Sequence, residues 1–149
     1  MVARSAAEEA LHKLLQRMDV CSSKLEDVVL GEQQAIHRFD TIALVEFADI
    51  RRTCHQELQE LESQCRNLVH QYNVPDEPGL KYFIDIHLRG AAPNLQTLRR
   101  ALHVRMMHIN EVSEENRIHL KAAFDAATGV LKHIGAMEHS QTYGPGKAA

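Results

Sequence analysis

The chain lacks tryptophan and has only three tyrosines and four phenylalanines among its 149 residues. A core must therefore be built from aliphatic side chains and methionine, which suits packed helices better than a β-sandwich. The chain also lacks any apolar run of the roughly 18 residues that a membrane span needs. Its first residues, MVARSAAEEALHK, lack the apolar segment of a signal peptide. These absences predict a cytoplasmic protein with no stable membrane insertion.

The chain also has no large excess of charge of one sign. Its 17 Lys and Arg residues are interspersed with 20 Asp and Glu residues, for a net charge of -3. No basic patch with interleaved aromatic residues is present, so nucleic-acid binding is not expected. The chain has no Gly-rich phosphate loop, no G-x-S-x-G and no H-E-x-x-H sequence. We therefore expect a protein that is not an enzyme and uses no cofactor.

Cysteine and histidine are the remaining residue types that could build a chemical site. Cys54 and Cys65 are eleven positions apart in a helical pattern, which is about 16 Å along a helix and too far for a disulfide. With Cys21 they are expected to be buried free thiols. Among the ten histidines, only Glu9 and His12 have the Glu-x-x-His spacing of helical di-metal sites. A scattered, solvated set of histidines without a bound metal is the better interpretation.

The strongest pattern is an apolar repeat that runs from Asn94 to about Met137. Its residues at steps of seven are Leu95, Leu102, Ile109, Asn116, Ala123, Val130 and Met137. Further apolar residues lie three or four positions from these, so together they form an apolar seam on one helix face. A helix of roughly 43 residues is about 65 Å long, which is more than a small core covers. We therefore expect part of the seam to bind a partner.

Two further long helices are predicted upstream. Ser5 and Glu8 form a capping box, and an apolar stripe continues from there to about residue 39. Gly31 inside this stripe indicates a bend or a close helix approach and, less favourably, a hinge. Asp40 or Thr41 can cap a second helix that ends near residue 73. The break is so short that the two helices form either a hairpin or, less favourably, one continuous rod.

The segment NVPDEPG stops the second helix, because proline cannot continue it. Periodicity alone allows either a helix or a strand for the apolar piece Leu80–Leu88. A helix is favoured because no partner strand is predicted elsewhere. Pro93 and Asn94 then open the last helix, with Asn94 as its cap. The expected fold is all-α: an elongated antiparallel bundle of three long helices plus one short helix.

The final residues differ in character from the rest of the chain. The sequence EHSQTYGPGKAA has no apolar period and one aromatic residue, Tyr143. We expect one helical domain over residues 1–137 and a flexible tail over residues 138–149. A lone tyrosine among turn residues is also typical of a short docking motif, although composition favours a frayed end.

Asn116 is the polar residue on the apolar seam, between Ile109 and Ala123. A buried amide needs hydrogen-bond partners, and on a helical seam it can fix a register or a partner. It is either a satisfied core residue, an exposed one on an uncovered seam, or an anchor for a bound segment. The residues alone favour none of these.

Over nearly its whole length the chain resembles the FlgN family of flagellar export chaperones. The resemblance in the first two helices lies in Glu32, Ala35, Ile36, Phe39, Asp40, Leu44 and Phe47. A Leu-rich second helix, a Pro/Gly break and a long last helix with Asn116 follow, and TYGPG at Thr142–Gly146 is the most specific part. The chain departs from the family pattern at Ser113, where Asn is expected, and at Arg51 and Arg52, where Lys is common.

This resemblance implies a cytoplasmic chaperone for the hook–filament junction proteins FlgK and FlgL, with the export gate protein FlhA as a further partner. It implies a substrate-binding face made of Ile109, Asn116, Leu120, Phe124, Ala127 and Leu131. Tyr143 would contact the export gate. The physical argument agrees, since an exposed apolar helix face can bind an amphipathic segment.

Two other interpretations compete with the chaperone. A helical-bundle oligomer or adaptor with no export role would cover the seam permanently, and an uncovered seam also predicts self-association into a homo-oligomer. A metal-dependent helical bundle that uses His12 is the enzymatic alternative.

Overall fold

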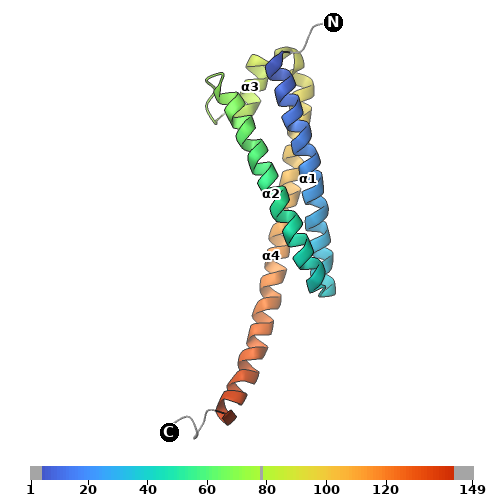
Figure 1. The fold of residues 1–149 in the computed structure, drawn as a ribbon, viewed down its shortest axis with the longest axis vertical. Coiled ribbons are helices and arrows are strands. Elements are labelled where there is room, and N and C mark those ends of the chain that lie inside the picture. Colours follow the sequence, from blue (N-terminus) through green and yellow to red (C-terminus); the bar gives the residue numbers. More distant parts are fainter. Residues whose placement is uncertain (1–4, 78, 143–149) are drawn as a thin grey trace. The chain divides into compact units, whose positions relative to one another are not determined.

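The structure is a computed structural model that describes residues 5–77 and 79–142, with side chains described as far as residue 135. Its elements are α1 (Ala6–Arg38), α2 (Thr41–His70), α3 (Gly79–His87), the short 3-10 helix η1 (Arg89–Ala91) and α4 (Ala92–Thr142) (Figure 1). The described residues contain no strand, so the predicted all-α fold is confirmed. The piece around Leu80–Leu88 is a helix, as expected.

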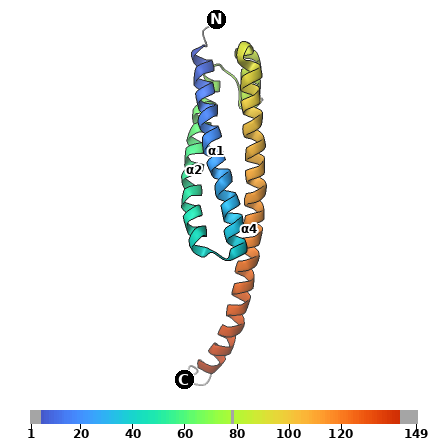
Figure 2. The same cartoon turned by 90° about the vertical axis from the view of Figure 1, so that its right-hand side faces the viewer.

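The chain divides into two units, the first spanning Met1–Ser113 and the second Glu114–Ala149. The first unit contains α1, α2, α3, η1 and the beginning of α4, and the second contains the remainder of α4. Within the first unit, α1, α2 and the first part of α4 run side by side (Figure 2). The sequence-based division into residues 1–137 and 138–149 stays a prediction.

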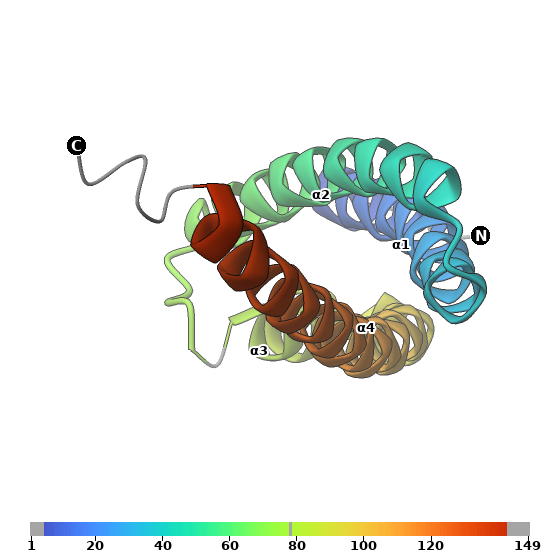
Figure 3. The same ribbon diagram turned by 90° about the horizontal axis from the view of Figure 1, so that it is seen from below.

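The first two helices form a hairpin, and not a continuous rod. The predicted cap of α1 is confirmed, because the Ser5 Oγ accepts a hydrogen bond of 3.1 Å from the Glu8 N–H. Phe39 ends α1 in a left-handed conformation with φ 55°. Asp40 then caps α2, since its Oδ1 accepts a hydrogen bond of 3.1 Å from the Ala43 N–H. This reversal places α1 directly beside α2 (Figure 3).

Gly31 lies at a close approach of the two hairpin helices. A Cβ atom at this position would lie 2.5 Å from Cζ of Phe47 on α2, which is well inside van der Waals contact. α1 continues unbroken through Gly31. Of the alternatives predicted for this glycine, the close helix approach is therefore the one found.

The core of the first unit consists of two apolar clusters. The first cluster includes Leu11, Leu15, Leu61, Val69, Phe83, Ile84 and Leu95. The second contains Cys21, Leu25, Val29, Cys54, Ile109 and Val112. Arg105 of α4 adds a polar link to α1, because its Nη1 donates to the Asp19 carbonyl (2.9 Å), the Asp19 Oδ1 (2.5 Å) and the Ser22 Oγ (3.2 Å). Apolar burial and this polar link together position α4 in the first unit.

The beginning of the last helix differs from the prediction. Asn94 is not its cap, because α4 already begins at Ala92, directly after η1. Pro93 therefore lies in the first helical turn, where its missing N–H and fixed φ are tolerated. The other end also differs, since α4 continues to Thr142 and not only to about Met137. Within the described residues, no helix is long and apolar enough to cross a membrane.

Candidate substrate-binding surface

The second unit presents an apolar helix face to solvent. Leu120, Phe124, Ala127 and Leu131 follow one another at steps of three or four along α4, so their side chains share one face. The exposed fraction is 39% for Leu120, 70% for Phe124 and 68% for Leu131. Ala127 is also exposed. Four residues of the predicted substrate face are thus brought together on one surface.

This surface extends further than the site predicted from the sequence. Ile134 lies three positions after Leu131 and is 47% exposed. Its place on the apolar seam was the signal that could have added it to the predicted site. We call Leu120, Phe124, Ala127, Leu131 and Ile134 the α4 stripe. A contiguous exposed patch of large apolar side chains marks an interaction surface more often than a single exposed residue does.

Ile109 and Asn116 are placed differently from the other four predicted residues. Ile109 is 2% exposed and packs in the second core cluster of the first unit, with Cys21 and Leu25. Asn116 is also only 2% exposed. Neither side chain is available to a bound segment in this conformation. Tyr143, the predicted gate contact, lies outside the described residues.

Charged side chains lie along one edge of the α4 stripe and stay in water. Arg117 donates two hydrogen bonds to the Glu114 carboxylate, from Nη2 to Oε1 at 2.6 Å and from Nε to Oε2 at 3.0 Å. This hydrogen bonding lowers the pKa of Glu114, so the carboxylate is ionised at neutral pH. Lys121 and Lys132 are exposed further along the helix. A helix with one apolar and one charged face is suited to bind another amphipathic helix.

Sequence reasoning missed a buried ion pair in the hairpin. Glu32 of α1 is 2% exposed, and its Oε2 accepts a hydrogen bond of 2.9 Å from Nη1 of Arg51 on α2. Burial raises the pKa of Glu32, and the Arg51 charge opposes this shift only in part. The signal was its spacing, because Glu32 lies three or four positions from the buried residues Val28, Val29 and Ala35.

The cysteines and histidines are the candidates for a reactive or metal-binding site. Cys21, Cys54 and Cys65 are free and buried, as predicted. Burial raises the pKa of the Cys21 and Cys65 thiols to about 11, so both stay protonated at neutral pH. In the part of the chain that the structure describes, no group of three or more His, Cys, Asp or Glu side chains is placed to hold a metal ion.

Comparison with known proteins identifies one family. A family model described as FlgN protein matches residues 1–149, which is the whole chain. Comparisons with curated proteins and with solved structures gave no match.

Proposed function

Because the chain belongs to the FlgN family, which is a family of flagellar export chaperones, we propose that it binds the C-terminal helical segments of the junction proteins FlgK and FlgL. In this proposal it works in the cytoplasm, prevents premature assembly of these proteins and delivers them to the export gate protein FlhA. It acts by binding and release and has no catalytic step.

The α4 stripe is the observation that carries this proposal. A segment that later assembles into a filament-type structure has an apolar face that must be kept from self-association. The stripe, with Phe124 at 70% and Leu131 at 68% exposure, can cover such a face as one helix packed on another. Removal of apolar surface from water on both sides is the main driving force for this association.

Release of the substrate follows from the same physics. A segment that is disordered when free must be ordered on binding, and this entropy cost reduces the net affinity for a given buried area. A modest affinity suits a substrate that must be handed on to the export apparatus. We assign the contact with FlhA to Tyr143, so that delivery and substrate binding use different residues.

Titration calorimetry with C-terminal peptides of FlgK and FlgL from the same organism tests the proposal. We expect micromolar or tighter binding with a negative heat-capacity change, because apolar surface is buried. Tyr143→Ala should leave these affinities unchanged and impair export in cells. A folded protein that gives no binding signal with either peptide would refute the proposed substrates.

A helical oligomer or adaptor without an export role is the alternative, because the same exposed stripe can pair with a second copy. Light scattering during dilution separates the two. A dimer that persists at nanomolar concentration and competes with the peptides would favour the oligomer, whereas a monomer that binds the peptides would favour the chaperone.

A further inference from the structure

The first unit contains an open apolar groove that the proposed substrate surface does not use. Two adjoining pockets of about 360 Å³ and 540 Å³ share Met18, Glu62 and Leu102 as lining residues. One extends toward Val69 on α2 and the other toward Leu58 on the same helix. We call these two pockets together the α2/α4 groove.

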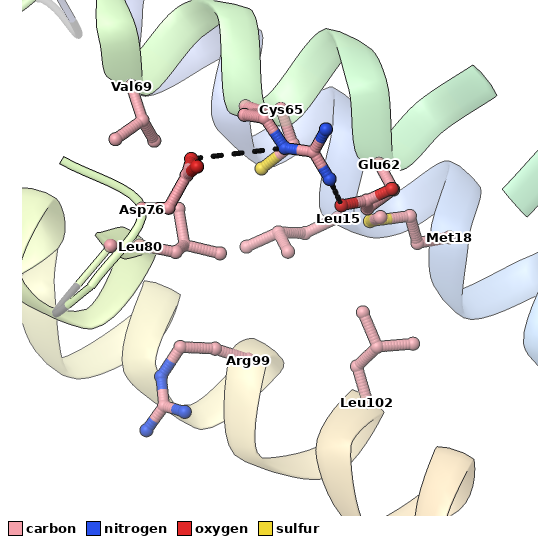
Figure 4. Close-up of a pocket in the computed structure, with 11 residues that line it drawn as sticks. Leu15, Met18, Glu62, Cys65, Val69, Asp76, Leu80, Arg99 and Leu102 are labelled. Carbon is pink, nitrogen blue, oxygen red and sulfur yellow. Dashed lines mark hydrogen bonds and ion pairs between the residues drawn. The ribbon is translucent and has the colours of Figure 1, made fainter. Parts of the chain in front are cut away.

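The shape of the groove fits a helical segment. Its α2 wall extends from His55 to Val69, and these fourteen positions correspond to about 21 Å, or roughly four helical turns. Its α4 wall includes Leu102 and Met106. Figure 4 shows Leu15 and Leu80 between the two walls in the pocket of about 360 Å³. A groove with apolar lining on both walls offers positions for the i, i+3, i+4 and i+7 anchors of an amphipathic helix.

The charged residues on the α2 side of the groove pair with one another. Arg66 forms an ion pair with Glu62 one turn away and lies 3.9 Å from Asp76. His70 Nε2 lies 2.8 Å from the same Asp76 carboxylate. Each acidic group on this side therefore already has a basic partner.

The α4 side carries a positive charge without an acidic partner among the described residues. Arg99 lines the groove, and Figure 4 shows it across the pocket from Glu62. Its Nε donates a hydrogen bond of 2.7 Å to Oε1 of Gln96. Gln96 is itself fixed, because its Nε2 donates to the Asp85 Oδ1 at 2.9 Å and to the Lys81 carbonyl at 3.0 Å. The fork of Arg99 is therefore oriented by a neutral amide, and its charge remains available to a carboxylate.

We propose that the α2/α4 groove binds an amphipathic helix of a partner protein that carries carboxylates along the edge facing Arg99. A second copy of this chain is a poorer occupant. One edge of its own α4 stripe carries Lys121, Asp125 and Lys132, a net positive set that does not complement Arg99. This partner site lies in the first unit and is independent of the proposed FlgK and FlgL surface.

A pair of synthetic helical peptides of about four turns tests the proposal with the full chain. Both peptides have leucines on one face, and one has glutamates along one edge where the other has lysines. Fluorescence anisotropy gives the affinities, and amide chemical shifts give the location. We expect the glutamate peptide to bind about tenfold more tightly and to shift residues around Leu15 and Leu102.

Arg99→Glu should abolish or reverse this preference, and Arg100→Glu is the matched control because Arg100 is exposed and does not line the groove. Arg99→Gln, which removes only the charge, is the second variant in case the charge reversal prevents folding. Equal affinities for the two peptides, equal effects at Arg99 and Arg100, or shifts confined to residues 114–135 would each overturn the proposal. Titration of the FlgK and FlgL peptides into the same variants keeps the two sites distinguishable, because the α4 stripe is intact in all of them.

Discussion

Replacement of Phe124 by alanine separates a binding residue from a core residue. Phe124 is 70% exposed, so its removal leaves no internal cavity, and the free energy of unfolding should change by less than about 0.5 kcal/mol. A buried phenylalanine removes on the order of 150 Å² or more from water. If a bound segment covers this side chain, its loss should cost about 2 kcal/mol, which is about a thirtyfold weaker Kd.

Titration calorimetry with the FlgK peptide, together with urea unfolding, measures both quantities. Ile118→Ala is the matched control, because Ile118 is 51% exposed but lies about 200° around the helix from Leu120. It should change the Kd by no more than about twofold. Ile109→Ala is the opposite control: Ile109 is 2% exposed, and this change should cost about 2–4 kcal/mol of stability. An affinity of the Phe124 variant within threefold of the unchanged protein would refute the assigned surface, and so would a loss of stability as large as that of the Ile109 variant.

Three further predictions concern the first unit. Gly31→Ala should lower the free energy of unfolding by about 1 kcal/mol, because the new Cβ atom would lie 2.5 Å from the Phe47 ring. In a Phe47→Ala background the same change should instead raise it by about 1 kcal/mol, because alanine has the higher helix propensity. Additive effects of the two substitutions in urea unfolding would contradict this prediction. Burial raises the pKa of Glu32 above 4.5, so the Glu32 carboxyl group binds its proton more tightly in the folded state than in the unfolded state. The protonated carboxyl group therefore contributes stability at low pH, and this contribution is lost as the pH rises through the folded pKa. Glu32→Gln should remove this part of the pH dependence in unfolding curves measured upward from pH 4.5; an unchanged slope would show that Glu32 does not cause it. Cys21 and Cys65, with pKa values raised to about 11, should react with a thiol reagent at pH 8 far more slowly in the native protein than in urea, and equal rates would contradict their burial.

Much of the fold could be predicted because local signals and the apolar pattern agree. Ser5 and Asp40 cap their helices as their side-chain chemistry predicts. The seam along α4 follows from helical periodicity alone. The choice between hairpin and rod could not be made from the sequence, because it depends on the left-handed conformation of Phe39, an aromatic residue in a position that usually favours glycine. The prediction that Asn94 caps α4 was wrong, because proline suits a first helical turn as well as a helix boundary.

The site could be predicted only in part, for a different physical reason. Periodicity identifies the residues that share a helix face, but it does not tell which part of that face other elements cover. Ile109 and Phe124 lie on the same seam, yet one is 2% and the other 70% exposed. The α2/α4 groove, and the fixing of Gln96 by Asp85 and Lys81, depend on contacts between different segments, which no local pattern encodes.

The two-residue connection between α1 and α2 also has a consequence for how the chain folds during synthesis. A loop this short costs little entropy to close, and contacts between neighbouring helices form quickly. We expect the hairpin, which ends at His70, to form before the whole of α4 has been made, because chains fold from the N-terminus as they emerge. Leu95 and Ile109, which fill the core from α4, then close it. The α4 stripe is translated after both, so this apolar surface emerges only from a chain whose core segments already exist.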